Sequence, residues 1–280
     1  MKMLKEYDCF MKKLASILLV VIIVLAVALT FVGCKDKDSE YNLVKKGTLT
    51  VSTNAAFAPF EYTLEDGTPT GIDMDIAKII ADELGLALKI DDMEFDSVIT
   101  AVTSKTADIA MAGLTVTEER KKAVLFTDTY YNSEQVVIAK TGDDILTKTT
   151  AEDVRELLKN QKVGAQNGTT GYFYITGDDD FGYDDIDGLV ASGYTNGTAA
   201  VMALKNDQIK YVVIDRLPAE ALVANNTGIA VCDVALTAEE YAFAVQLGNT
   251  ALADKVNKIV ADLVSSGKFN EIFKRHTIGE

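Results

Sequence analysis

Arg120 and Asp215 are the two residues of this chain whose chemistry most clearly suggests ligand binding. The planar guanidinium group of an arginine can donate two parallel hydrogen bonds to a carboxylate, which a lysine cannot do. Asp215 follows the apolar run 211–214, so its carboxylate should lie at the end of a buried strand and could accept from an ammonium group. The two residues together favour a site for a small molecule that carries both a carboxylate and an ammonium group.

Smaller polar groups could complete such a site. Thr115 adds a hydroxyl group, and the backbone N–H groups around Thr169 and Thr170 could complete the shell of a bound carboxylate from the opposite side. Main-chain carbonyl groups near Ala112 and Gly113 could help to hold the ammonium group. Simpler alternatives exist, because an arginine in the position of Arg120 is often only a solvated helix residue, and Asp215 could merely cap a helix over residues 217–223.

The elements that must position these residues alternate between strand-like and helical patterns, which is typical of βαβ units and a mostly parallel sheet. A first group has strands over 48–52, 87–90 and 108–112, with helices over 74–84 and 97–104. A second group has strands over 136–139, 162–165 and 211–214, with helices over 151–159 and 198–204. Asn54, Ala112, Thr169 and Asp215 then follow strands, at the carboxyl ends where open α/β sheets bind ligands.

Several helix boundaries can be assigned from single residues. Asp73 and Asp96 are expected to cap the helices that follow them, and Thr117 to cap a helix that begins with two glutamates. Gly85 supplies a left-handed stop. Apolar residues at helical spacing over 252–263 predict a helix that ends at Gly267, followed by a short last helix over 268–275.

Composition excludes several classes of function. The chain has 42 acidic and 27 basic residues, for a net charge of −15, so its surface repels nucleic acid and anionic lipid headgroups. It has only one histidine, which makes a His-based catalytic triad or a multi-histidine zinc site hard to build. The acidic stretch 177–185 does not have the spacing of an EF-hand loop, and a solvated loop is the better interpretation. We therefore expect no metal and no cofactor.

The three cysteines form no disulfide framework. Cys232 lies in an apolar alternating run and is expected to be a buried structural thiol. Cys34 ends the run Leu29–Cys34, which follows Lys12, Lys13 and an apolar stretch over 14–32, and this arrangement is typical of a bacterial lipoprotein signal. An uncleaved transmembrane helix is the alternative. The prediction is a signal peptide over 1–33, a tether over 34–42 that begins with a lipid on Cys34, and an extracytoplasmic folded region held to the cell membrane by that lipid.

Four separated stretches, in this order, resemble the family 3 extracellular solute-binding proteins, which are the polar amino acid receptors of ABC importers. They are residues 54–62, 71–76, 112–120 and 168–171 with Asp215 downstream, and the resemblance covers the chain from about Leu43 to the C-terminus. It implies a two-lobed α/β fold of the periplasmic-binding-protein type II, with two chain crossovers near 132–135 and 238–241. Lobe 1 would contain residues 43–132 and 242–280, and lobe 2 residues 133–241.

The resemblance also implies a function: the lobes close on an L-amino acid and a membrane permease recognises the closed form. The protein would be a binding protein and not an enzyme, and it would act as a monomer. The residues expected to bind the ligand are Asn54, Phe57, Phe95, Ala112, Gly113, Thr115, Arg120, Gln166, Thr169, Thr170 and Asp215.

Departures from the family pattern bear on the choice of ligand. The glutamine receptors that this chain most resembles carry an aspartate where Asn54 stands, a lysine where Gln166 stands and a histidine where Ile214 stands. A pocket without these charged partners would leave the cation of a lysine or arginine side chain unpaired, which is costly. A neutral amino acid, such as glutamine, cystine or an aromatic amino acid, is therefore expected.

Two other functions remain open at this point. The same fold resembles periplasmic cyclohexadienyl dehydratases, which need a general acid or base, and Glu61 is the one pocket-side candidate. A lipoprotein with the same pocket could also be an amino acid sensor or a surface adhesin.

Overall fold

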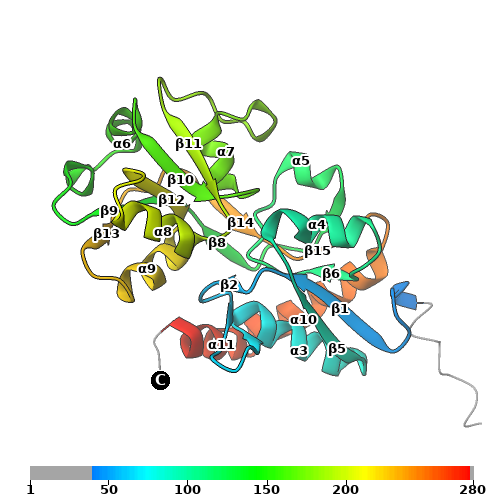
Figure 1. The fold of residues 1–280 in the computed structure, drawn as a ribbon. Helices are drawn as coiled ribbons and strands as arrows, with labels where there is room; N and C mark the ends of the chain where they lie inside the picture. The colour runs from blue at the N-terminus through cyan, green and yellow to red at the C-terminus, as the bar shows by residue number, and fades with distance from the viewer. Residues whose placement is uncertain (1–39, 278–280) are drawn as a thin grey trace, which may run out of the picture. The chain divides into compact units, whose positions relative to one another are not determined.

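The computed structural model describes residues 40–277. The described chain from Tyr41 onward forms one compact unit. Within the described residues, this unit contains two five-stranded sheets with helices on both faces of each (Figure 1). The predicted α/β class is therefore confirmed, and so are the positions of the predicted strands and helices to within a few residues.

Four of the five strands of the first sheet run in parallel. β1 pairs in parallel with β5 and β6, and only β15 runs in the opposite direction, between β6 and β7. β15 is also the one strand of this sheet that the chain enters after its return from the second sheet. In spatial order the strands are β5 (Ala87–Asp92), β1 (Thr48–Thr53), β6 (Ile109–Ala110), β15 (Ala244–Gln246) and β7 (Val124–Phe126).

The second sheet repeats this arrangement. β10 pairs in parallel with β11 and β12, and only β9 runs against its neighbours, β12 and β13. β9 is the first strand of this sheet along the chain, so in both sheets the reversed strand directly follows a crossing from the other sheet. In spatial order the strands are β11 (Val190–Tyr194), β10 (Lys162–Gln166), β12 (Tyr211–Asp215), β9 (Gln135–Lys140) and β13 (Ile229–Val231).

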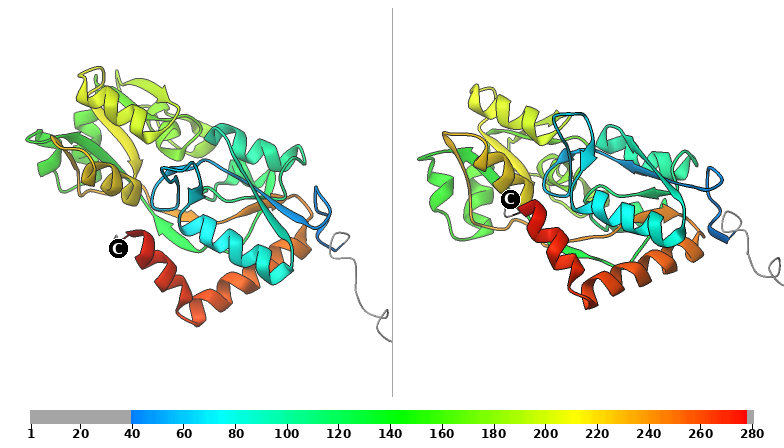
Figure 2. Two further views of the ribbon diagram at one scale, coloured as in Figure 1. Left: turned by 60° about the horizontal axis from the view of Figure 1, so that its bottom comes forward. Right: turned by 90° about the horizontal axis from the view of Figure 1, so that it is seen from below.

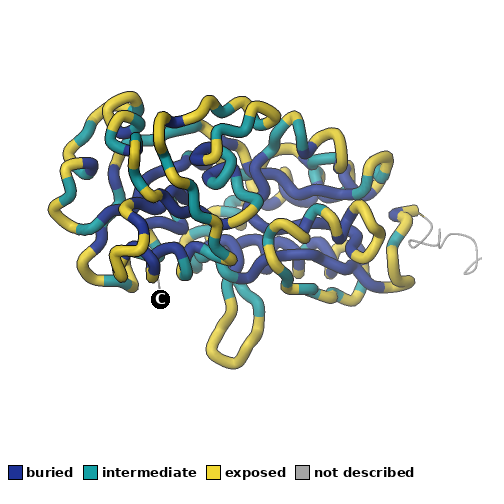
Figure 3. Tube along the Cα trace, turned by 45° about the horizontal axis from the view of Figure 1, so that its top comes forward, coloured by how far each residue is buried: buried dark blue, intermediate teal, exposed yellow. Residues whose placement is uncertain are grey.

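Alternating apolar side chains bury both faces of each sheet, because successive residues of a strand point to opposite sides. In the first sheet, Val51 and Ile109 pack with α3 (Ile72–Leu84) and α10 (Thr250–Ser265). On the other face, Ala110 and Ala244 pack with α4 (Phe95–Thr103). Figure 3 shows the resulting buried stretches running through the strands, with the exposed stretches in the outer loops.

The second sheet is covered in the same way by four helices. Val212 and Ile214 share a cluster with α8 (Gly197–Lys205) and α9 (Arg216–Ala224). Tyr211 and Val213, which point to the opposite face, pack with α6 (Ala151–Leu158) and α7 (Thr170–Thr176). Cys232 is free and buried in this second cluster, and its thiol donates to the carbonyl of Ile145, which confirms the prediction of a buried thiol.

Two short strands connect the sheets at the predicted crossovers. β8 (Tyr131–Ser133) leads from the first sheet to the second, and β14 (Glu239–Tyr241) leads back. They pair with each other antiparallel, with Glu239 opposite Ser133. We call β8 and β14 the crossing strands. The other short elements are β2 (Ala56–Phe57), β3 (Glu61–Thr63), β4 (Pro69–Thr70), α5 (Glu118–Lys121), two 3₁₀ helices (Asp144–Thr147 and Asp179–Phe181) and α11 (Lys268–Thr277).

The predicted helix caps are partly wrong. Thr117 caps α5 by accepting from the N–H of Arg120, and Gly85 ends α3 with φ 64°, both as expected. Asp73 does not cap α3, which begins earlier, after Gly71. Its buried carboxylate accepts instead from the Gly113 N–H and the Tyr130 hydroxyl group. Asp96 lies in the first turn of α4, behind Glu94 at the cap position, and makes no cap hydrogen bond. Tertiary partners therefore decide the role of Asp73.

The single histidine holds the C-terminal helix in place. Nδ1 of His276 lies 3.1 Å from the hydroxyl oxygen of Tyr62, and Nε2 lies 3.0 Å from Oδ2 of Asp75 in α3. Arg275 forms an ion pair with the same carboxylate at 2.7 Å. In Figure 2, α10 and α11 run one after the other along the underside of the first sheet, with α11 near the N-terminal end of α3. The contacts of His276 therefore tie α11 to β3 and α3.

The predicted signal peptide, Cys34 and most of the tether lie outside the described residues. The folded region begins two residues earlier than expected, because Tyr41 is buried and its carbonyl accepts from Asn249. Among the helices of residues 40–277, none has the length and apolar character that a membrane crossing requires.

Candidate functional site

The predicted site residues lie where the strands of both sheets end. Asn54 follows β1, Ala112 follows β6, Thr169 follows β10, and Asp215 is the last residue of β12. These carboxyl ends meet beside the crossing strands, so side chains from the two sheets can reach one another. Predicted site residues that are far apart in the sequence are thereby brought into one region.

Arg120 is the most constrained member of this group. Its side chain extends from α5 into the interior, where the residue is only 7% exposed. One amino group of the guanidinium donates to the carbonyl of Thr115 at 2.8 Å and the other to the carbonyl of Gly168 at 3.0 Å, so it touches loops that follow strands of both sheets. Its Cζ lies 5.6 Å from the ring centroid of Phe95. Within the described residues it forms no ion pair, so three of its five N–H groups are left for a carboxylate.

Asn54 and Gln166 form a neutral contact between the two sheets. The amide nitrogen of Gln166 donates to Oδ1 of Asn54 at 2.8 Å and to the carbonyl of Thr195 at 3.1 Å. The amide nitrogen of Asn54 donates to the carbonyl of Met93 at 2.7 Å. Both side chains are buried. The sequence places these residues 112 positions apart, and nothing in their local pattern indicates that they meet.

Asp215 occupies the cap position of α9 but makes no cap hydrogen bond with its side chain. Its Oδ1 accepts instead from the hydroxyl groups of Tyr241 and Ser133, which belong to the crossing strands. The carboxylate is buried, at 4% exposure, and no arginine or lysine of the described chain pairs with it. A simple capping role, the alternative that the sequence left open, therefore does not describe this residue.

Glu239 is a residue of this region that the sequence analysis missed. It lies in the crossing strand β14, is 6% exposed, and accepts from three hydroxyl groups. Its Oε2 accepts from Thr115 at 2.6 Å and from Thr170 at 2.9 Å, and its Oε1 accepts from Thr237 at 3.1 Å. In β14 Glu239 and Tyr241 are buried and Glu240 is exposed, but the sequence Glu-Glu-Tyr does not itself indicate which glutamate is buried.

Burial dominates the electrostatics of the group. Burial, and then the charge of Glu239, raise the pKa of Asp215 to about 7, although hydrogen bonds from Tyr241, Gln135 and Ser133 act in the opposite direction. Burial also lowers the pKa of Arg120, although Glu239 and Asp215 favour its charged form. An unpaired carboxylate and an unpaired guanidinium are thus held in one poorly solvated region, where an oppositely charged partner would interact strongly with each.

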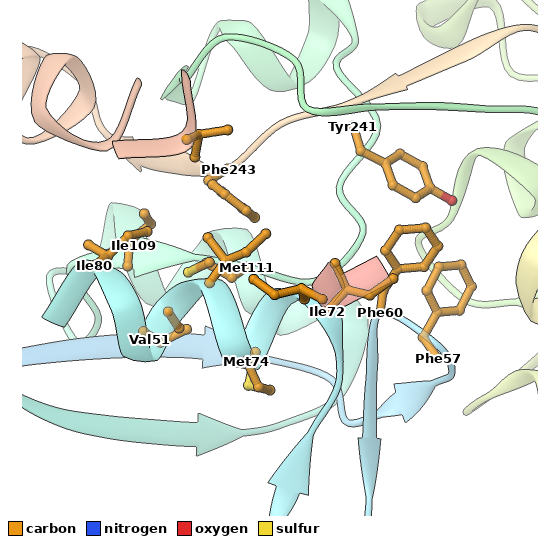
Figure 4. Close-up of a cluster of buried hydrophobic side chains, with 14 of the residues drawn as sticks. Val51, Phe57, Phe60, Ile72, Met74, Ile80, Ile109, Met111, Tyr241 and Phe243 are labelled. Carbon is orange, nitrogen blue, oxygen red and sulfur yellow. The ribbon is translucent and has the colours of Figure 1, made fainter. Parts of the chain in front are cut away.

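Aromatic rings form one wall of the region. Phe57 is buried and stacks on Phe60, whose ring centroid lies 5.1 Å from that of Tyr241 (Figure 4). Gly113 lies against this wall with φ 53°, and a Cβ atom placed on it would come within 2.9 Å of Cε1 of Phe57. Phe95 is only partly buried and lies next to the guanidinium of Arg120.

A Gly113→Ala variant should therefore be less stable than the wild type. The left-handed backbone and the close approach to Phe57 together are expected to cost roughly 1 to 3 kcal/mol in free energy of unfolding. Thermal unfolding of the ligand-free proteins measures this loss. Gly142 also has a positive φ, 87°, but no atom lies within 4 Å of a Cβ placed there, so Gly142→Ala separates backbone strain from the clash. Equal losses in the two variants would contradict the predicted contribution of Phe57.

Ala112 and Thr169 were expected to contribute backbone groups, and their side chains have other partners. The side chain of Ala112 packs in the hydrophobic cluster of α4, so only its backbone can face a ligand. The hydroxyl group of Thr169 caps α7 by accepting from the N–H of Tyr172, and it donates to the carbonyl of Gln166. Thr170, the next residue, is the one whose hydroxyl group reaches Glu239.

Glu61, the candidate acid or base of the enzymatic alternative, is completely buried. Burial and then the charge of Asp73 hold its pKa well above the usual value. Among residues 40–277, no group of three or more His, Cys, Asp or Glu side chains is arranged to hold a metal ion. A cavity of about 990 Å³ adjoins the site beside the crossing strands, and Thr115, Ser133, Tyr183 and Glu239 are among its lining residues.

The protein has two α/β lobes joined by two crossing strands. The lobes meet at a region with unpaired charges from both, and this arrangement defines a two-lobed ligand-binding protein. The chain belongs to the bacterial extracellular solute-binding proteins, family 3, whose sequence model matches residues 49–279. This membership confirms the resemblance that the four sequence motifs indicated.

Similar proteins agree with this assignment. The arginine-binding extracellular protein ArtP of Bacillus subtilis is 29% identical over 268 residues, which cover 94% of this chain and 98% of ArtP. A crystal structure of a mutant of ArgBP from T. maritima is 34% identical, with a TM-score of 0.76, and the match covers 86% of this chain and 98% of that one. An ancestral arginine-binding protein has been solved with glutamine bound, at 34% identity and a TM-score of 0.73, covering 83% of this chain and 98% of that one.

Proposed function

We propose that this protein is an extracytoplasmic, lipid-anchored receptor that binds an L-amino acid between two closing lobes and delivers it to an ABC import permease. Family membership supports a binding role outside the cytoplasm. The amino acid class is supported by the names of its relatives, which include arginine-, histidine- and cystine-binding proteins. Lobe 1 would contain residues 43–132 and 242–280, and lobe 2 residues 133–241, which agrees with the position of the crossing strands.

The observation that carries this proposal is the buried guanidinium of Arg120, which has no anionic partner within the described chain and touches loops of both lobes. In the proposed complex it receives the carboxylate of the ligand, together with backbone N–H groups near Thr169 and Thr170. Asp215, with carbonyl groups near Ala112 and Gly113, receives the ammonium group. A ligand held from both lobes stabilises the closed form over the open one.

For the side chain of the ligand, we propose a neutral polar amino acid such as glutamine. The distal part of the site contains Phe57, Phe95 and the amide pair of Asn54 and Gln166. An amide side chain can exchange hydrogen bonds with these two amides, whereas a cation would be buried beside them without a fixed carboxylate.

Arginine is the second candidate, and one observation favours it. Glu239 is a buried carboxylate in the same region with no arginine or lysine partner in the described residues, and the guanidinium of a bound arginine would balance its charge. Arginine is also what ArtP and ArgBP bind according to their names. The ancestral relative has been solved with each of the two ligands, so one scaffold of this kind accommodates both.

A thermal-shift panel of the twenty L-amino acids and cystine tests the proposed function. A ligand that binds only the folded state, present at 100 times its Kd, should add about 2.7 kcal/mol to the free energy of unfolding, or roughly 5 to 10 °C in melting temperature. We expect glutamine to give a larger shift than lysine or arginine. The panel should use protein refolded from denaturant, because ligand carried over from the cells would hide the shift. A larger shift with arginine would select the second candidate, and no shift with any amino acid would contradict the proposed function.

The alternatives make different predictions. A cyclohexadienyl-dehydratase-like enzyme would convert prephenate-type acids, and an assay of products would detect this activity. The carboxyl group of Glu61 is completely buried and therefore offers such a reaction no accessible base. A sensor or adhesin would bind the same amino acid but would not require a permease, so uptake of the labelled amino acid in cells with and without this protein separates that role from import.

A further inference from the structure

Glu239 provides a contact that neither lobe provides alone. Its carboxylate lies on the crossing strand β14, while Thr115 follows β6 in the first sheet and Thr170 begins α7 beside the second. Both threonine hydroxyl groups donate to the same oxygen atom, Oε2, at 2.6 and 2.9 Å. The pair of contacts therefore requires the two lobes to be close together.

A hydroxyl group has only one hydrogen, so these contacts determine what else each threonine can do. Once its proton is directed at Glu239, the oxygen of Thr115 can only accept a further hydrogen bond. The same holds for Thr170, whose oxygen already accepts from the amide nitrogen of Gln135 at 3.2 Å. A ligand carboxylate has no hydrogen to offer, whereas an ammonium group has three. The hydroxyl group of Thr115 therefore suits the ammonium end of an amino acid, and not the carboxylate end that the sequence analysis assigned to it.

We propose that Glu239 is a positioning residue that selects the ammonium group of the ligand, by directing the hydroxyl protons of Thr115 and Thr170 away from the ligand and by adding a second negative charge beside Asp215. This inference rests on the proposed function, because it assumes an amino acid ligand. Glu239 acts through the threonines and through its charge. The ammonium site is complete only when the lobes are closed, because only then do both threonines reach one carboxylate.

The charge of Glu239 affects the pKa values of the surrounding titratable groups. These are Asp215 and Tyr241 from β12 and β14, Arg120 from α5, and Tyr183 from the loop that lines the adjoining cavity. Of these, Asp215 titrates closest to neutral pH, and the charge of Glu239 raises its pKa. Removal of that charge should therefore lower the pH at which Asp215 ionises.

Glu239→Gln tests the inference, with Glu240→Gln as the matched control, since Glu240 is the exposed neighbour in the same strand. The probes are two pairs: L-glutamine with glutaramic acid, and L-arginine with 5-guanidinopentanoic acid. In each pair the second compound lacks the ammonium group. We expect Glu239→Gln to weaken binding of the amino acid about tenfold or more, because it loses a charged hydrogen-bond acceptor, and to change binding of the des-amino acid less than threefold. Glu240→Gln should resemble the wild type.

The pH profile gives a second readout, which needs only the amino acid. The midpoint of the fall in affinity at low pH should move to lower pH in Glu239→Gln and stay unchanged in Glu240→Gln. Equal weakening of both members of a pair, or an unchanged midpoint, would show that Glu239 only supports the fold and would overturn the inference. If the wild type bound none of the four probes and no amino acid of the panel, the proposed function itself would fail, which is a different outcome.

Discussion

Arg120→Ala should weaken amino acid binding by roughly 2 to 5 kcal/mol, a loss of about thirtyfold to several thousandfold. The proposed ligand brings a carboxylate into a region from which water is largely excluded. The guanidinium of Arg120 lies there, since this residue is 7% exposed, and it forms no ion pair within the described chain. Without it the carboxylate is buried unpaired, and this cost accounts for most of the expected loss.

Isothermal titration calorimetry measures this change directly. Lys121→Ala is the matched control, since Lys121 is the next residue of α5 and its ammonium group pairs on the surface with Glu118. Arg120→Lys should fall between the wild type and Arg120→Ala, because it keeps the charge but not the forked geometry. The melting temperatures of the ligand-free variants should be recorded as well, because Arg120 also donates to the carbonyl groups of Thr115 and Gly168. Wild-type affinity in a folded Arg120→Ala protein would remove this residue from the site.

The affinity for the ligand should fall about tenfold for each unit of pH below about 7. Burial and the charge of Glu239 raise the pKa of Asp215 to about 7 in the ligand-free protein. A bound ammonium group favours the ionised carboxylate, so binding below this pH requires Asp215 to release a proton. The affinity should therefore be constant above pH 7 and decrease as the pH falls. The ligand does not contribute to this profile, because its α-groups do not titrate between pH 5 and 7.

Asp215→Asn is the variant that tests this interpretation. It should bind more weakly than the wild type above pH 7, by roughly 2 to 5 kcal/mol, with an affinity that no longer depends on pH between 5 and 8. Calorimetry in buffers of different ionisation enthalpy should also detect about one proton released per ligand bound by the wild type at pH 6, and none by the variant. A wild-type affinity that is the same at pH 5.5 and pH 8 would contradict an ammonium contact at Asp215.

The stability of the ligand-free protein should respond to pH in the opposite sense. Since the pKa of Asp215 is higher in the folded than in the unfolded chain, the folded state binds more protons between about pH 4 and pH 7. The contribution of this residue to the free energy of unfolding therefore decreases as the pH rises through that window. Asp73, with a pKa raised to about 6 by burial, acts in the same direction. The difference in the pH dependence of the free energy of unfolding between the wild type and Asp215→Asn gives the contribution of Asp215.

Local pattern was sufficient to predict most of the elements. Residues 252–263 carry apolar side chains at helical spacing, and these are the buried residues of α10. Central strands such as β9 and β12 coincide with short apolar runs, because strands buried on both faces have few polar residues. The predicted caps at Asp73 and Asp96 were wrong. Asp73 is instead buried and accepts from Tyr130 and Gly113, which are far away in the sequence.

The candidate site was predicted to the extent that its residues stand in recognisable motifs. Arg120 and Thr115 lie in one such stretch, and Asp215 ends an apolar run, so their types and spacing indicated binding of a charged small molecule. Glu239 and Ser133 belong to no such motif. They reach the site because the two crossing strands pair with each other between the lobes.

Residue order alone determined the α/β class and the presence of a guanidinium and a carboxylate suited to a small zwitterion. These features follow from burial periodicity and side-chain chemistry, which are local, whereas the two crossings were implied by the resemblance to a known family. Only the tertiary structure decided which groups meet, as when Glu239 accepts from Thr115, 124 positions earlier, and so determines the direction of its hydroxyl proton. The physical reason is that hydrogen-bond direction and desolvation depend on three-dimensional neighbours, and chain order does not specify these neighbours until the lobes fold and approach each other.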